Sequence, residues 1–318
     1  MDILLLVLGI VFLIKGSDWF VEGASDIAKV FKIPSLIIGM TIVAFGTSAP
    51  EAAVSISASI QRSSSIALGN VIGSNIFNLL AVVGVSACIA KLNVENEVTK
   101  RDFPFNILAT IAIIVCCMDI FTDASDAIII SRTDGMLLLC LFIVFMFYTV
   151  SGALAQRKNM ESETPKRKIL LSLIMLVTGI AGVVAGGKFT VDGASGIAKA
   201  LGVPENLIAL TIVAVGTSLP ELVTSVTALK KGESDIAIGN VIGSNIFNLL
   251  FIVGLSASIR PLSTDMSSLV DSLILLAVNI VVYALVLKNK SFARASGIFM
   301  TSLYVVFAVF VVLRGTVL

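Results

Sequence analysis

Histidine is absent from this chain of 318 residues, and charged residues make up only 14% of it. The lack of histidine excludes imidazole metal sites and histidine proton relays. Cysteine is scarce as well: Cys88, Cys116, Cys117 and Cys140 lie in apolar segments without CxxC spacing, and we interpret them as small buried hydrophobic side chains. The net charge of +1 gives no indication of a nucleic-acid partner.

Hydrophobic residues, in contrast, account for 57% of the chain, more than a water-soluble globular protein usually carries. Apolar stretches of roughly 20 residues, enough to cross about 30 Å of hydrocarbon, recur along the whole length. We therefore predict an all-α integral membrane protein in the lipid bilayer, with ten transmembrane helices. These are expected to begin near Ile3, Leu36, Ser65, Phe105, Thr133, Lys168, Glu205, Ser234, Leu269 and Ala293.

The basic residues between these spans are unevenly distributed. With ten spans both termini share one side, whose loops carry Arg62, Arg132, Lys199, Arg260 and Arg314. The opposite side carries Lys29, Lys32, Lys91, Lys100, Arg101, Arg157, Lys158, Lys166, Arg167, Lys168, Lys230, Lys231, Lys288, Lys290 and Arg294. The positive-inside rule assigns the second group to the cytoplasm, so we expect a multi-pass protein of the cell membrane with both termini extracellular or periplasmic.

Two long motifs occur twice with one register shift. TIVAFGTSAPE at residues 41–51 returns as TIVAVGTSLPE at 211–221, and IALGNVIGSNIFNLL at 66–80 returns as IAIGNVIGSNIFNLL at 236–250. The chain thus consists of two homologous halves.

Because each half holds five predicted spans, an odd number, the second half must enter the membrane from the opposite face. We expect residues 1–155 and 169–318 to form two inverted-topology repeats of five helices, joined by a short basic cytoplasmic linker at 156–168. In such transporters the substrate site lies at the repeat interface, near the bilayer midplane.

Each copy of the first motif places a proline and a glutamate inside an apolar span. Pro50 and Pro220 have no backbone N–H, so we expect each helix to kink or break there and to free carbonyl groups. Beside them stand Glu51 and Glu221, at a depth where an unpaired charge costs at least a few kcal/mol. No basic residue lies in these motifs, so a bound cation or a proton must compensate the charge.

The neighbouring polar side chains all offer oxygen atoms. They are Thr47, Ser48, Ser74, Asn78, Thr217, Ser218, Ser244 and Asn248. Ligation by oxygen alone suits Ca2+ or Na+ and argues against Zn2+ or Cu2+. Two carboxylates match the charge of one Ca2+, and equally of two Na+ or two protons, which allows one site to alternate between substrates.

Simpler roles compete with this interpretation. An intramembrane glutamate can be a protonated packing group, and Asn78 or Asn248 can be interhelical hydrogen-bond donors. Asn75 and Asn245 face elsewhere on their helices, which favours a structural role. We interpret the acids Asp18, Glu22, Asp119, Asp123 and Asp126, near predicted membrane ends, as solvated.

With its paired GTSxPE and GNxxGSN segments, the whole chain resembles the cation/Ca2+ exchanger superfamily, in particular the prokaryotic Na+/Ca2+ exchanger branch. The resemblance implies exchange of Na+ moving inward for Ca2+ moving outward, with long first and sixth helices that slide across the bundle. It implies a ligand set of Ala44 and Ala214, through their carbonyls, with Thr47, Ser48, Glu51, Ser74, Thr217, Ser218, Glu221 and Ser244. Several members carry Asp where Asn248 stands here, which leaves stoichiometry and K+ dependence open.

We therefore expect a Na+/Ca2+ antiporter that is not an enzyme, is monomeric, and has no cofactor. A Ca2+/H+ antiporter, or one exchanging another divalent cation for H+, is the first alternative of the same fold. A passive cation channel is less favoured, because a channel usually builds its filter on an axis shared by identical subunits. An intramembrane aspartyl protease would need two acids sharing a proton, which two glutamates alone do not exclude.

Overall fold

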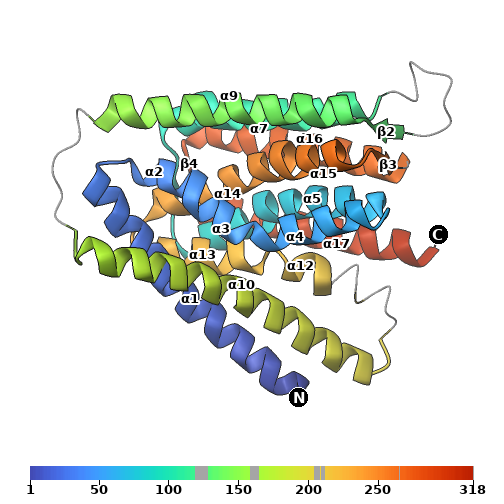
Figure 1. Cartoon of the computed structure of the whole chain (residues 1–318), viewed down its shortest axis with the longest axis horizontal. Coiled ribbons are helices and arrows are strands. Elements are labelled where there is room, and N and C mark those ends of the chain that lie inside the picture. The colour runs from blue at the N-terminus through green and yellow to red at the C-terminus, as the bar shows by residue number, and fades with distance from the viewer. Residues whose placement is uncertain (119–127, 158–164, 204–207, 209–211, 265, 318) are drawn as a thin grey trace.

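The computed structural model describes residues 1–118, 128–157, 165–203, 208, 212–264 and 266–317. Within these residues the chain is helical apart from four short strands (Figure 1). The long helices are α1 (Asp2–Phe31), α9 (Arg132–Arg157), α10 (Ile169–Ala200), α16 (Met266–Asn289) and α17 (Arg294–Val317).

Shorter segments build the interior. In the first part of the chain these are α2 (Ser35–Ile38), η1 (Gly39–Val43), α3 (Ala44–Thr47), α4 (Ala49–Ile60), α5 (Ser64–Phe77), η2 (Asn78–Val82), α6 (Val83–Ile89), η3 (Val98–Asp102) and α7 (Phe103–Cys116), where η denotes a π-helix. In the second part they are α12 (Ala214–Gly216), α13 (Leu219–Lys230), α14 (Ser234–Ile246), η5 (Phe247–Ile252) and α15 (Val253–Ile259).

Two pairs of short antiparallel strands join distant parts of the chain. Strand β1 (Leu92–Asn93) pairs with β4 (Ser291–Phe292), and β2 (Ile128–Ile130) pairs with β3 (Leu262–Thr264). Figure 1 shows β2, β3 and the C terminus at one end of the helices and β4 at the other. Each pair therefore links the first and second sequence repeats.

Seven helices in the described residues are long and apolar enough to cross a membrane. They cover residues 2–31, 64–89, 132–157, 169–200, 234–259, 266–289 and 294–314. Segments 35–47 and 49–60, bent by 51° at a short break, form an eighth span if taken together. The protein is thus an all-helical membrane protein, as expected.

Two of the ten predicted spans are not among these eight. The seventh, which was expected to begin near Glu205, starts outside the described residues. The fourth corresponds to η3 and α7, which form one continuous helix from Val98 to Cys116. Lys100, Arg101 and Asp102 lie in η3, so the apolar part of this helix is only the 14 residues of α7, fewer than a full crossing needs.

Helices α1 and α10 pack side by side and run obliquely to the other helices (Figure 1). Their contact is a seam of glycines seven residues apart. A Cβ on Gly9, Gly16 or Gly23 would lie within 2.7 Å of a backbone nitrogen of α10, and Gly179, Gly186 and Gly193 face the backbone of α1 in the same way. Residues 9, 16 and 23 meet 190, 183 and 176 in turn, so the two helices are antiparallel.

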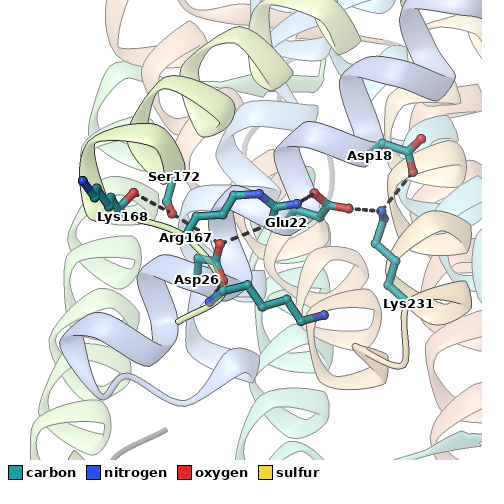
Figure 2. A network of polar contacts seen from close by, with 8 residues as sticks. Asp18, Glu22, Asp26, Arg167, Lys168, Ser172 and Lys231 are labelled. Atoms are coloured by element: carbon teal, nitrogen blue, oxygen red, sulfur yellow. Dashed lines mark hydrogen bonds and ion pairs between the residues drawn. The ribbon is translucent and has the colours of Figure 1, made fainter. Parts of the chain in front are cut away.

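The side chains of Asp18 and Glu22 are 35% and 30% exposed, and both also form ion pairs that the sequence interpretation did not include. Figure 2 shows them on one face of α1 with Asp26, facing Arg167 and Lys231. Lys231 Nζ lies 2.7 Å from Glu22 Oε1 and 3.2 Å from Asp18 Oδ1, and Arg167 lies 2.5 Å from Glu22 and 3.4 Å from Asp26. Sequence spacing placed the acids on one helix face, but the basic partners are far away in the chain. Asp119, Asp123 and Asp126 lie outside the described residues.

These ion pairs also change the pKa of Lys231. Burial alone would lower the pKa of Lys231, but its hydrogen bonds to Glu22 and Asp18 outweigh burial and hold that pKa above its ordinary value. The lysine therefore stays charged, and it ties α1 to the turn between α13 and α14.

The glycine seam predicts a sharp difference between two glycine substitutions. A Cβ on Gly16 would lie 2.7 Å from Val183 N, a backbone atom that cannot move independently, whereas on Gly152 of α9 it would meet only the guanidinium of Arg101 at 3.1 Å. Gly16→Ala should lower stability by about 1–3 kcal/mol, as overpacking does, and Gly152→Ala should not. Thermal unfolding of the purified variants in detergent would measure this, and equal melting temperatures would argue against a tight seam.

Candidate cation site

Both helix breaks predicted at the prolines are present. Helix α3 ends at Thr47 and α4 begins at Ala49, with Pro50 in its first turn. Helix α12 ends at Gly216 and α13 begins at Leu219, with Pro220 in its first turn. Proline is tolerated in a first turn because its missing N–H has no intrahelical partner there. Each break therefore sets a serine and a glutamate at the start of a new helix in the interior.

The two glutamates are held by serines of both sequence repeats. Ser218 Oγ donates to Glu51 Oε1 at 2.8 Å, and Ser48 Oγ donates to Glu221 Oε1 at 2.8 Å. These contacts are reciprocal and bring the two breaks together.

Each carboxylate also has a longer contact within its own half. Ser74 Oγ lies 3.4 Å from Glu51 Oε1, and Ser244 Oγ lies 3.5 Å from Glu221 Oε1. In both glutamates Oε1 receives all of these hydroxyl groups.

The second oxygen of each carboxylate has no protein partner. Glu51 and Glu221 have no solvent exposure, and their Oε2 atoms are buried without a hydrogen bond. Neither forms an ion pair with a basic residue in the part of the chain that the structure describes. A buried, unpaired carboxylate is costly, so these atoms are placed to accept a cation or a proton.

The threonines contact the site through asparagines that the sequence interpretation missed. Thr47 Oγ1 donates to Asn240 Oδ1 at 2.9 Å, and Asn240 Nδ2 donates to Ser225 Oγ at 3.0 Å and to the Glu221 carbonyl at 3.4 Å.

The first repeat contains the same arrangement in looser form. Asn70 Nδ2 donates to Ser55 Oγ at 2.9 Å and to the Glu51 carbonyl at 3.4 Å, and Thr217 Oγ1 lies 3.5 Å from Asn70 Oδ1. The sequence does contain a sign that these asparagines belong to the site. Asn70 and Asn240 precede Ser74 and Ser244 by four residues and so lie on the same helix faces.

Asn78 and Asn248 lie in the π-helices η2 and η5, and π-helical turns are frequent at functional sites. Segment η2 packs against α13, which carries Glu221, and η5 packs against α4, which carries Glu51. Both asparagines are fully buried, and the Oδ1 atom of each has no hydrogen-bond partner.

The structure thus brings most of the predicted ligand residues together. The carbonyl of Ala44 accepts hydrogen bonds from the backbone N–H of Ser48 at 2.9 Å, from Thr47 Oγ1 at 3.2 Å and from Ser244 Oγ at 3.4 Å. Ala214 begins α12, and its side chain is among those not described.

The donor set has a clear chemical character. It consists of two carboxylates and neutral oxygens, and within the described ranges no three His, Cys, Asp or Glu residues cluster as a metal site. Two charged groups surrounded by hydroxyl and amide oxygens suit a hard cation that is bound and released.

Comparison with known proteins gives consistent results. The family model described as "Sodium/calcium exchanger protein" matches residues 1–151 and 171–313. The chain is 35% identical to the sodium/calcium exchanger MaX1 of Methanosarcina acetivorans over 97% of both chains, and 35% identical to the inner membrane protein YrbG of Escherichia coli over 95% of this chain and 94% of the other. The solved structure of the sodium-calcium exchanger NCX_Mj superposes with a TM-score of 0.82 at 33% identity, covering 96% of each chain.

The reciprocal serine contacts predict a stability difference. Ser48→Ala and Ser218→Ala each remove a 2.8 Å donor from a buried carboxylate oxygen, so each should cost about 1.5–3 kcal/mol, the value for a hydrogen bond to a charged group. Ser57→Ala, at an exposed position of α4, is the matched control and should be neutral. Chemical unfolding in detergent would measure the three, and three equal stabilities would show that these contacts contribute nothing.

Proposed function

Because this chain belongs to the sodium/calcium exchanger family, whose members are transporters and not enzymes, we propose that it is a secondary active antiporter exchanging Na+ for Ca2+. The transported ions bind at the site around Glu51 and Glu221, and no cofactor is needed. Ca2+ and Na+ are its substrates.

One observation carries this proposal: the two buried carboxylates, each with one oxygen satisfied by serines and one without a partner. Two negative charges balance one Ca2+ or two Na+, so the same oxygens can serve both ions in turn. Competition for one site couples their movements without a second pocket. The ligands we propose remain those expected from the sequence, with the carbonyls of Ala44 and Ala214 completing the set.

The architecture we propose is ten transmembrane helices in two inverted repeats, residues 1–155 and 169–318, joined by the linker at 156–168. The reciprocal Ser48–Glu221 and Ser218–Glu51 contacts support it, because they relate the two halves symmetrically. The antiparallel packing of α1 on α10, which are equivalent helices of the two halves, supports it as well.

Alternating access then follows from movement of α1 and α10. Their glycine seam joins them backbone to backbone, so they would move as one unit. Such a unit sliding past the bent segments α3–α4 and α12–α13 would expose the site first to one side of the membrane and then to the other.

A Ca2+/H+ antiporter of the same fold is the second candidate. It is favoured by the same unpaired Oε2 atoms, since burial disfavours the charged form of a carboxylate and so favours a bound proton. The coupling ion therefore has to be decided by transport measurements.

The transport prediction uses proteoliposomes loaded with Na+ and diluted into Na+-free medium that contains radiolabelled Ca2+. Wild-type protein should take up Ca2+ only while the outward Na+ gradient lasts, and Glu51→Gln and Glu221→Gln should abolish uptake because each removes half of the charge of the site. Glu97→Gln, at an exposed surface glutamate, is the control and should transport normally.

Other outcomes have definite meanings. Uptake driven by a pH gradient instead of a Na+ gradient would establish the Ca2+/H+ candidate, with site and fold unchanged. Uptake that needs neither gradient would contradict antiport and indicate a channel.

The proposed orientation places the basic end of the protein, with the linker, in the cytoplasm and both termini outside. It can be tested with single cysteines at exposed positions in a variant whose four native cysteines are replaced. A membrane-impermeant maleimide should label Arg132→Cys in intact cells and Lys288→Cys only after the cells are opened. The reverse pattern would invert the orientation.

A further inference from the structure

Four buried asparagines form a closed set of hydrogen bonds between the two halves of the chain. Asn75 Nδ2 donates to the Asn245 carbonyl at 3.1 Å, and Asn245 Nδ2 donates to the Asn75 carbonyl at 3.4 Å. Asn248 Nδ2 donates to Asn75 Oδ1 at 3.0 Å, and Asn78 Nδ2 donates to Asn245 Oδ1 at 3.1 Å. None of the four side chains is exposed to solvent.

The orientation of each amide in this set follows from the backbone carbonyl at one end of its chain of hydrogen bonds. A backbone carbonyl can only accept, so the end of Asn75 that faces the Asn245 carbonyl must be its NH2 group. The Oδ1 of Asn75 then faces Asn248, so Asn248 must donate to it from its own NH2 group. As a result, Asn248 keeps its Oδ1 on the opposite side, where it has no protein partner. The same steps from the Asn75 carbonyl through Asn245 leave the Oδ1 of Asn78 without a partner.

We propose that Asn75 and Asn245 are positioning residues, which lock the amide flips of Asn248 and Asn78 so that each presents oxygen, and not NH2, to the transported cation. This inference rests on the function proposed above. It concerns how the ligands are oriented, and Asn75 and Asn245 themselves do not contact the ion.

The alternative, that all four asparagines only bind the helices together, does not account for where the two unpaired oxygens lie. In such a network a buried amide oxygen would normally find a donor, since leaving one unsatisfied costs free energy. Asn106, on α7, also has a buried Oδ1 without a partner, so the location of these atoms is what distinguishes Asn78 and Asn248. Both lie on segments that pack against the helices carrying Glu221 and Glu51.

The orientation matters because an asparagine side chain has two ends of opposite polarity. Its oxygen carries a negative partial charge and can ligate a cation, whereas its NH2 group carries a positive partial charge and would repel one. A flipped Asn248 would replace a ligand with a repulsive group, although the residue and the packing volume remained the same. A lock on the flip therefore contributes to affinity.

The experiment is a double-mutant cycle on Ca2+ affinity, measured by titration calorimetry of the purified protein in Na+-free detergent solution. Asn75→Ala removes the lock and should raise the Ca2+ Kd about tenfold. In the background Asn248→Asp the same substitution should change the Kd less than about twofold, because a carboxylate presents an oxygen whichever way it turns. A merely structural Asn75 would weaken binding equally in both backgrounds.

Asn245→Ala, alone and with Asn78→Asp, repeats the cycle in the other half, so the proposal stays testable if one variant does not fold. Asn106→Ala is the control for loss of a buried interhelical asparagine, since Asn106 bonds Asn279 on α16. It should lower the melting temperature and leave the Ca2+ Kd unchanged.

Two failures can be told apart. Wild-type protein that binds no Ca2+ would contradict the proposed function, and this inference with it. Normal Ca2+ binding by the wild type, together with equal losses in both backgrounds or no loss for Asn75→Ala, would overturn the positioning role alone.

Discussion

The interior of this protein is organised by one electrostatic constraint: two carboxylates, Glu51 and Glu221, are buried in an apolar helix bundle and form no ion pair with a basic residue among those the structure describes. A permanent ion pair with lysine or arginine would neutralise both carboxylates and leave no negative charge to bind a cation reversibly. Instead, neutral hydroxyl groups satisfy one oxygen of each carboxylate. The other oxygen remains available to a cation or a proton that binds reversibly.

That constraint explains why irregular backbone lies deep in the molecule. At the breaks, Ser48 and Ser218 each donate to the glutamate of the other repeat. Beside the site, α1 and α10 remain unbroken for 30 and 32 residues and pack against each other through glycine. The chain therefore combines a bent, polar centre with a straight, closely packed pair beside it, which is the division of roles that the proposed alternating access needs.

The sequence predicted the helical membrane class, the two breaks and the principal polar residues, because all of these depend on composition or on short motifs that occur twice. It did not predict the pairing across the halves. Asn75 and Asn245 face away from Ser74 and Ser244 on an isolated helix, and only the packing of α5 on α14 shows that they meet. The ion pairs of Asp18 and Glu22 were not predicted for the same reason, since Lys231 and Arg167 approach α1 from distant parts of the chain.

Ion selectivity in such a site cannot come from charge alone, because two carboxylates balance one Ca2+, two Na+ or two protons equally well. It has to come from where the neutral oxygens are held. The hydroxyl groups of Ser48 and Ser218 can rotate, but each is directed by its 2.8 Å bond to a carboxylate. The amides of Asn78 and Asn248 could each present NH2 instead of oxygen. Their NH2 groups are held by Asn245 and Asn75, which are themselves fixed by donating to backbone carbonyls. In the proposed site, hydrogen bonds that do not touch the ion would therefore contribute to the choice of ion that the two glutamates bind.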